Sequence, residues 1–545
     1  MVIKPSYGAG AGNWVLEASR ESETMLEEAA RTPDTTARAC HEVELRLLAP
    51  PDMLDQLREA PVIVQSARNK GTVRRLEAVY YDTPGHLFAS HGLSLRVRRS
   101  GKLHTQTLKR AVAGNVLTRQ EWEAPVDSLI PDLAHLPIAE LGTPFEGLAV
   151  EGLIPIFTTK VRRHVRMLDL PDASIEIAFD NGEIEAGVRS QPLSEIELEL
   201  KGGMAGALYE FGLSLLDAAP LQIGTAGKAE RGYALALDRR PSAARALPLA
   251  LRAENNVDGA VMTLLAGCQH HLIGNVAIAF GRDPEGVHQM RVALRRLRTA
   301  VSLLRKELPV PSLQALSAEA RHLARLLGPA RNWDVFVGET LAEIENAGLS
   351  GIDVASLRDA AQPYRLACHG AVRDGLADPR TGRFLLSLGR LIERRSWRGE
   401  VASERLSVIT EPVGALAERA LTRLRSKALH RGRGFARLSP EERHHLRLTL
   451  KKLRYAAEFF LPLYAGRPQV RTYLKNLSKL QDALGAANDA SSSAPLLHEI
   501  AQGSTAPNVH RALGAVIGWQ GRGEKEPQGA LRRAWRRFKQ ASPFW

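Results

Sequence analysis

The spacing of apolar residues changes once along this 545-residue chain, near residue 240, and that change limits the folds it can adopt. Up to about residue 201, short segments such as HEVELRLLA and SEIELELK alternate apolar and polar side chains. A period of two is typical of β-strands with one face on a core. Beyond about residue 250, apolar residues follow the helical period, as in VHQMRVALRRLR. The chain therefore combines a β-rich part with an all-α part.

Eight such strands fall within about 160 residues, which predicts an antiparallel sheet or a closed barrel. A stretch with Pro and small residues at 239–250 predicts a linker. We therefore expect an α+β chain with domains at 41–238 and 251–520. A poorly ordered extension at 1–40 and a basic segment at 521–545 would flank them.

The two parts differ in charge. Residues 1–250 carry a net charge of −5 and residues 251–545 a net charge of +18, which gives +13 for the chain. An excess of this size favours a polyanionic partner such as nucleic acid, an acidic membrane or polyphosphate. A solvated basic surface that only aids solubility is an equal alternative on charge alone.

Other features narrow the class of protein. No stretch approaches 18 consecutive apolar residues, and the first residues lack the apolar region of a signal peptide, so neither a spanning helix nor secretion is expected. The cysteines Cys40, Cys268 and Cys368 are far apart and odd in number. They disfavour a disulfide framework and favour a reducing cytoplasm.

The polar faces of the strands carry charge in ordered rows. Alternation groups Glu42 with Glu44 and Arg46, Arg96 with Arg98, and Glu195 with Glu197, Glu199 and Lys201. Like charges two residues apart repel, so each row needs a partner. In one interpretation the rows are solvated outer faces joined by salt bridges. In the other the sheet closes around them, so that carboxylates hold a divalent cation and arginines hold a phosphate chain.

The strands resemble the CYTH domain, the family of triphosphate tunnel metalloenzymes, over about residues 41–238. HEVELRL is similar to the ExExK opening strand of that family, and YYDTP, LRVR, TLKR, RQEWE, FDNGEI, EIELELK and GKAERGY follow in the family's order. The resemblance implies an eight-stranded antiparallel tunnel. The tunnel would bind a linear triphosphate and a divalent metal, Mg²⁺ or Mn²⁺.

The resemblance also implies roles for single residues. The metal ligands would be Glu42, Glu44, Glu197 and Glu199, supported by Glu195. The phosphate ligands would be Arg96, Arg98, Lys109, Arg119, Arg162 and Lys228. The implied chemistry is hydrolysis of the terminal phosphoanhydride, with Glu42, Glu44 and Arg46 as catalytic residues. Arg46 departs from the lysine that ends ExExK. If that lysine helps to orient the water, turnover falls while phosphate binding survives.

The helical half contains an internal duplication. HxxRxxxRRxR, which starts at His288, and HxxRxxxKKxR, which starts at His444, share the offsets of their cations. LG turns follow at Gly328 and Gly485, 40 and 41 residues after the histidines. At about 100° per residue each motif places its cations on one broad helix face.

This arrangement resembles the CHAD domain over about residues 251–520, with helical repeats at about 255–400 and 401–520. The resemblance implies that inorganic polyphosphate binds in a basic groove. The implied ligands are His288, Arg291, Arg295, Arg298, His322, His444, Arg447, Lys451, Arg454 and Lys479. A flexible polyanion needs a line of cations and little shape specificity. Nucleic acid is less expected, because no aromatic platform accompanies the cations.

The two resemblances together predict a cytoplasmic inorganic triphosphatase that splits tripolyphosphate into diphosphate and phosphate. Its helical domain would bind polyphosphate and associate with polyphosphate granules. Three alternatives stay open: a non-catalytic granule protein, a class IV adenylate cyclase acting on ATP, and a nucleic-acid binder. No membrane partner is expected, and the oligomeric state is not readable from the sequence.

Overall fold

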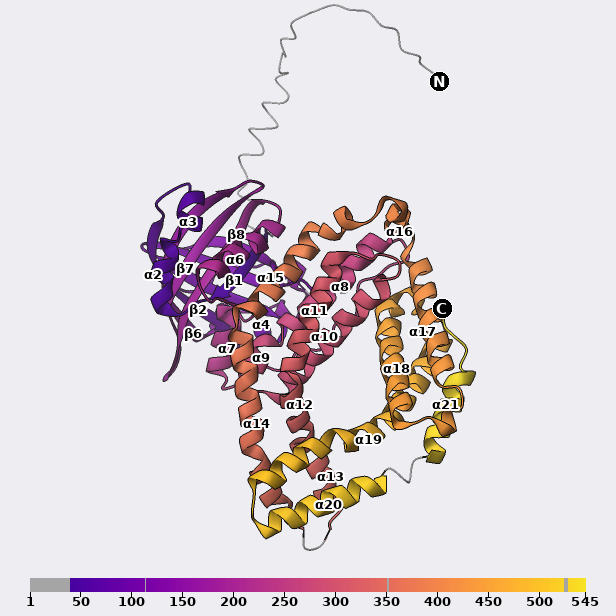
Figure 1. Cartoon of the computed structure of the whole chain (residues 1–545). Coiled ribbons are helices and arrows are strands. Elements are labelled where there is room, and N and C mark those ends of the chain that lie inside the picture. Colours follow the sequence, from indigo (N-terminus) through magenta and orange to yellow (C-terminus); the bar gives the residue numbers. More distant parts are fainter. Residues whose placement is uncertain (1–39, 113, 350–351, 524–527) are drawn as a thin grey trace, which may run out of the picture.

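The computed structural model describes residues 40–545 apart from 113, 350–351 and 524–527 (Figure 1). The extension expected at 1–40 lies outside these residues except for Cys40. The strands are β1 (Cys40–Leu48), β2 (Thr72–Asp82), β3 (Leu93–Ser100), β4 (Leu103–Ala111), β5 (Thr118–Val126), β6 (Ile154–Leu170), β7 (Ala173–Ala186), β8 (Arg189–Gly203) and β9 (Gln222–Ile223).

The first eight strands form a closed antiparallel barrel. They pair in the order β5-β4-β3-β2-β6-β7-β8-β1, and β5 also pairs with β1. The two-residue strand β9 pairs with the last residues of β1, Leu47 and Leu48. The predicted eight-stranded antiparallel barrel is thus confirmed.

The larger part of the apolar core of the β-domain lies outside the barrel wall, and a smaller cluster that includes Tyr80 and Phe157 lies inside it under α7. Leu45 and Leu47 of β1 and Ile196 and Leu198 of β8 are buried with Leu215 in a cluster that also contains helix side chains. Because strand side chains alternate between faces, the charged residues between these apolar ones point inward. Helices cover the wall and one end of the barrel: α2 (Pro51–Arg58), α3 (Pro61–Ser66), α4 (Leu87–Ser90), α5 (Ile138–Leu141), α6 (Gly206–Ala218) and α7 (Lys228–Ala236).

The rest of the described chain is helical, as predicted. Its helices are α8 (Val257–Ile273), α9 (Val276–Phe280), α10 (Pro284–Leu304), α11 (Pro311–Leu326), α12 (Gly328–Val335), α13 (Leu341–Asn346), α14 (Val354–Ala377), α15 (Pro379–Arg394), α16 (Leu406–Thr410), α17 (Val413–Arg431), α18 (Pro440–Phe460), α19 (Gln469–Gly503), α20 (Pro507–Gly523) and α21 (Gln528–Gln540). The motif helices α10 and α18 contact each other. From α18, α19 runs toward α12 and α14, and α20 returns alongside α19 toward α21 (Figure 1).

One stretch of the described chain, Val257–Phe280, is long and apolar enough by length and composition to cross a membrane. It comprises α8 and α9, and 61% of its most apolar window is buried inside the structure. α8 packs against α10 and α15. Its apolar side chains therefore contribute to the core of the helical domain.

The two domains share one hydrophobic core. α6 of the β-domain packs along α15, and close contact is possible because Gly389 lies directly under the ring of Tyr209. The Tyr209 hydroxyl accepts a hydrogen bond from Gln269 at 3.2 Å, and Arg394 forms ion pairs with Glu210 and Asp172. The domains are thus held in a fixed orientation by side chains far apart in the sequence.

Candidate functional site

The barrel encloses a cavity of about 1380 Å³ that continues to the linker and to the α8–α9 turn. The candidate tunnel residues that line it are Glu42, Glu44, Arg46, Arg96, Arg98, Lys109, Arg119, Glu197, Glu199 and Lys228. The charged rows therefore line this cavity rather than the outer surface of the barrel. Of the two arrangements that the strand pattern allows, the structure has the one in which the sheet closes around the charged rows.

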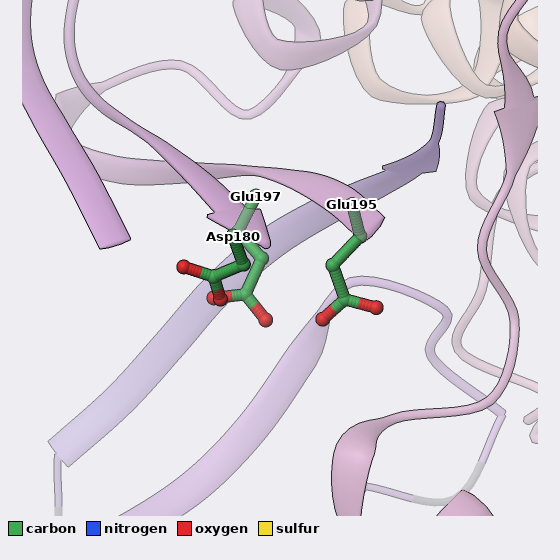
Figure 2. Close-up of side chains that lie close together, drawn as sticks. All are labelled: Asp180, Glu195 and Glu197. Atoms are coloured by element: carbon green, nitrogen blue, oxygen red, sulfur yellow. The ribbon is translucent and has the colours of Figure 1, made fainter. Parts of the chain in front are cut away.

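Three buried carboxylates converge near α7. Figure 2 shows Asp180, Glu195 and Glu197 pointing into one space, with ligand oxygens within 4.8 Å of one another. That spacing would suit a metal ion. However, the Lys228 ammonium lies 2.8 Å from Asp180, 2.5 Å from Glu195 and 2.7 Å from Glu197. The chain's own ammonium therefore occupies the centre of this acidic trio.

Two arginines complete the neutralisation of the trio. Arg163 Nε donates to Asp180 at 2.7 Å, and its Nη2 donates to both Asp180 and Glu197. Arg46 donates to Glu197 at 3.4 Å. Burial alone would raise the pKa of Glu197, but the surrounding cations, Lys228 first, hold it well below its ordinary value. At this end of the tunnel, the carboxylates are therefore neutralised by lysine and arginine side chains of the protein itself.

The carboxylates of Glu44 and Glu199 are less well compensated. The two residues face each other across the β1–β8 pair. Burial raises the pKa of Glu44 despite its ion pair with Arg46, and nearby carboxylates raise it further. Burial also raises the pKa of Glu199, although Lys201 opposes this. Buried carboxylates whose pKa stays raised despite one cationic partner each fit a hard divalent cation such as Mg²⁺ or Mn²⁺.

Strand β3 presents an excess of positive charge to the same cavity. Arg98 lies 3.6 Å from Glu123, and Arg96 lies 3.9 Å from Glu121, so both ion pairs are loose. Repulsion from Arg96, followed by burial, lowers the pKa of Arg98 to about 10. Two guanidinium groups held together in this way favour an anion with several oxygens between them.

The structure places Arg162 and Arg163 differently from the sequence expectation. Arg162 is exposed and lies outside the cavity lining, whereas Arg163 faces the interior. On β6 the inward face also carries Val161 and Val165, so apolar and charged residues share it. A phase shift of one residue exchanges the two faces of a strand, and the mixed composition hid that phase.

The two motif helices begin in the same way. Asp283 accepts hydrogen bonds from backbone amides at the start of α10, and Ser439 does so at the start of α18. Each capping residue stands five positions before the motif histidine, His288 or His444, and is followed by proline. Capping side chains and proline at the first position both favour helix initiation. The duplication therefore includes the signals that start the helices.

The glycines of the two LG motifs lie beside matching arginines. The turn expected at Gly485 is not observed, because α19 continues through this residue as a helix, whereas Gly328 is the first residue of α12, directly after α11. A Cβ on Gly328 would lie 3.1 Å from Arg291 Nη1, and one on Gly485 would lie 3.7 Å from Arg447 Nη2. Arg291 also donates to the carbonyl of Ala324 at 3.0 Å. The second cation of each motif thus lies beside the LG glycine of its own repeat.

Cations from other helices extend the motif faces. Burial lowers the pKa of Lys452, and Lys427, Arg298, Arg305 and Arg431 lower it further. Arg298 belongs to α10, and Arg305 follows the last residue of α10. Lys427 and Arg431 belong to α17, and Lys452 belongs to α18. Lys427, Arg305 and Arg431 lie outside the repeated motif, so the sequence gives no signal for them and only the fold brings them together.

Not every motif cation belongs to this surface. Arg296 is buried, donates to Glu458 at 2.9 Å and lies 4.8 Å from the Phe459 ring centroid. It therefore joins α10 to α18. Arg454 also pairs with Glu458, at 3.4 Å. The remaining expected polyphosphate ligands are half-buried or exposed on their helices: His288, Arg291, Arg295, Arg298, His322, His444, Arg447, Lys451 and Lys479.

Two family models match the chain. One, described as CYTH domain, matches residues 41–233, and the other, described as CHAD domain, matches residues 263–498. Among curated proteins, the chain is 37% identical over 159 residues to an inorganic triphosphatase from Haemophilus influenzae. That match covers 29% of this chain and 44% of the relative, so less than half of the relative is represented.

The chain also matches solved structures over part of its length. A CHAD domain from the plant Ricinus communis is 29% identical with a TM-score of 0.47, over 54% of this chain and 96% of that one. PptA from Streptomyces chartreusis is 16% identical with a TM-score of 0.40, over 52% of this chain and 100% of that one.

Proposed function

Because this chain carries a CYTH domain followed by a CHAD domain, we propose that it is a metal-dependent inorganic triphosphatase with a polyphosphate-binding domain. The tunnel would split tripolyphosphate into diphosphate and phosphate. One observation carries the proposal: cations of β3 and β4 and carboxylates of β1 and β8 line one cavity inside the barrel. The related inorganic triphosphatase supports this choice of substrate.

The cations of the tunnel would hold the phosphate chain. Arg96, Arg98, Lys109 and Arg119 line one continuous part of the cavity. Planar guanidinium groups can each bind two phosphate oxygens, and a lysine adds a compact charge. These groups would fix the triphosphate and offset the charge that develops as the anhydride bond breaks.

The carboxylates Glu42, Glu44 and Glu199 fit a divalent metal. They offer oxygen donors, and burial raises the pKa of Glu44 and of Glu199 even though each carboxylate has an ion-pair partner, Arg46 and Lys201. When bound, Mg²⁺ or Mn²⁺ would supply charge neutralisation on the phosphate oxygens. Glu197 would join these ligands only by giving up contact with Lys228. We therefore assign Glu197 first to the ion-pair network at the α7 end.

A second candidate function is triphosphate binding without turnover. It is favoured by Arg46, whose guanidinium contacts Glu44 and also reaches Glu195 at 3.5 Å and Glu197 at 3.4 Å. A permanently charged group fixed on Glu44 would compete with a metal for that carboxylate. In this case the chain would retain tripolyphosphate and release no phosphate.

The helical domain would bind polyphosphate through the cations of both repeats. Support comes from the matching positions of Arg291 and Arg447 and from the group of cations around Lys452. A chain of phosphates could neutralise such a surface without base-specific contacts. A protein that binds in this way would associate with polyphosphate granules in the cytoplasm.

A substrate panel tests the proposed function. The purified chain would be incubated with tripolyphosphate, ATP, thiamine triphosphate or long polyphosphate, each with Mg²⁺ and with Mn²⁺. We expect phosphate and diphosphate in equal amounts from tripolyphosphate, and no cyclic AMP from ATP. Retention of tripolyphosphate without phosphate release would favour the binding function. Cyclic AMP formation would favour the cyclase alternative.

A further inference from the structure

A small hollow lies between α19 and α21, outside the barrel and beyond the motif helix α18. Its volume is about 230 Å³. The residues that line it are Asn476, Lys479, Ala483, Ala530, Arg533, Ala534 and Arg537. Lys479, Arg533 and Arg537 are exposed, and none of them pairs with a carboxylate within the described part of the chain. Three cations therefore face one hollow without a counter-charge from the protein.

The helix that supplies the arginines is firmly anchored. Trp535 of α21 stacks on Phe435 with ring centroids 4.9 Å apart and an interplanar angle of 4°. Phe538 is fully buried and lies 6.0 Å from the Tyr473 ring. These aromatic contacts fix the apolar face of α21 on the second repeat. Its arginines are consequently held at the hollow rather than on a loose tail.

In the first repeat, a cation at the matching place is paired with a carboxylate. Glu319 stands nine residues before Gly328, and Asn476 stands nine residues before Gly485, so the two occupy matching places. In the first repeat Arg380 of α15 donates to both oxygens of Glu319, at 2.8 and 2.9 Å. The second repeat has an amide instead of that carboxylate, while α21 still presents its cations.

We infer that this hollow is an anion site that binds a phosphate group of an inorganic polyphosphate chain. The inference rests on the proposed polyphosphate binding, and it adds Arg533 and Arg537 of α21 to the expected ligand Lys479. Like charges four residues apart, as at Arg533 and Arg537, repel in the unliganded helix. A phosphate between them and Lys479 would remove that repulsion and form charge-assisted hydrogen bonds. The alanines of the lining offer no stacking surface for nucleic-acid bases.

The test compares two double variants of the full chain. Arg533→Ala with Arg537→Ala removes the cations of the hollow. Arg532→Ala with Arg536→Ala removes the same charge from the same helix, but these exposed arginines do not line the hollow. Binding of long-chain inorganic polyphosphate is titrated at several salt concentrations. Circular dichroism checks that both proteins keep their helix content.

We expect the first pair to weaken binding about tenfold and to flatten the dependence of log affinity on log salt by about one to two units. The control pair should change affinity less than twofold. A third variant, Asn476→Glu, restores the carboxylate of the first repeat. It should pair with the arginines, weaken polyphosphate binding and raise the melting temperature of the free protein.

Equal losses in the two double variants would overturn the site, because the effect would then depend on total charge alone. Unchanged affinity in Asn476→Glu would also overturn it. Failure of the wild-type chain to bind polyphosphate would overturn the proposed polyphosphate binding together with the hollow. If the wild type binds polyphosphate normally and both double variants lose affinity equally, the proposed polyphosphate binding stands and only the site in the hollow is overturned.

Discussion

The Lys109 ammonium lies 2.6 Å from a carboxylate oxygen of Glu42, although the two residues are 67 positions apart in the chain. Burial alone would raise the pKa of Glu42, but Lys109 holds it below its ordinary value. Lys109 also lies 3.3 Å from Glu121. A candidate phosphate ligand and a candidate metal ligand thus neutralise each other. Binding of a metal triphosphate would replace this contact by two new ones, Lys109 to phosphate and Glu42 to metal.

We predict that Lys109→Gln raises the KM for tripolyphosphate about tenfold or more, because one charge-assisted hydrogen bond to the phosphate chain is lost. Steady-state phosphate release measures the effect. Lys160→Gln is the matched control, since Lys160 is exposed on the outer face of β6 and pairs with Glu185. Equal KM values in the two variants would argue against phosphate contact by Lys109.

Arg163 and its neighbour Arg162 should differ sharply in their effect on stability. Arg163→Ala leaves the fully buried Asp180 with less compensation and should lower the free energy of unfolding by about 3 kcal/mol. Arg162→Ala removes an exposed side chain and should change it by less than about 0.5 kcal/mol. Urea denaturation of both variants measures the difference. The reverse order would mean that Arg162 is the inward residue.

The barrel itself could be predicted from the sequence, and the phase of one strand could not. In β1 and β8 the charged and apolar residues alternate cleanly, so alternation groups Glu42 with Glu44 and Glu197 with Glu199 on one face of each strand. The resemblance to the CYTH domain then predicted that this face points into the tunnel. In β6 two adjacent arginines stand between valines, and alternation alone fits either phase. Which arginine points inward depends on Asp180, a partner on another strand.

The contact between the domains should be sensitive to one methyl group. A Cβ on Gly389 would lie 2.1 Å from the Tyr209 ring, so Gly389→Ala forces α15 and α6 apart. We expect a loss of about 1–3 kcal/mol in stability and faster proteolysis within 239–250. Gly370→Ala, in α14 with open space around it, should be neutral or slightly stabilising. Equal protease resistance in the two variants would contradict the docking.

His271 should make the stability of the helical domain depend on pH. Burial lowers the pKa of this histidine from 6.5 to about 4, although its hydrogen bond with Gln289 opposes the shift. As pH falls from 6.5 toward 4, the unfolded chain takes up a proton that the folded chain does not. Stability contributed by neutral His271 is therefore full above about pH 6.5 and is lost on acidification, by up to about 3 kcal/mol.

His271→Gln tests this dependence. The free energy of unfolding would be measured for the wild type and the variant between pH 7 and pH 4.5. The wild type should lose more stability than the variant over this range, since other groups titrate in both proteins. Parallel pH profiles would show that His271 contributes nothing to the acid sensitivity.

Contacts between charged residues that are far apart in the chain could not be predicted from the sequence at either site. The motifs correctly indicated a CYTH and a CHAD domain, because each motif is local in sequence. Nothing local shows that Lys228 enters the trio of Asp180, Glu195 and Glu197, or that α21 places arginines opposite Lys479. Such pairings depend on how α7 and α21 dock, and docking is decided by apolar contacts elsewhere.

The most direct test of the central claim is phosphate release from tripolyphosphate by the double variant Glu42→Gln with Glu44→Gln. Loss of two inward carboxylates should reduce the metal-dependent rate at least about a hundredfold. Glu183→Gln with Glu185→Gln, on the outer face of β7, is the matched control and should keep the wild-type rate. Polyphosphate binding by the helical domain should be unchanged in both. A wild-type rate of hydrolysis in Glu42→Gln with Glu44→Gln would contradict the assignment of the reaction to the tunnel.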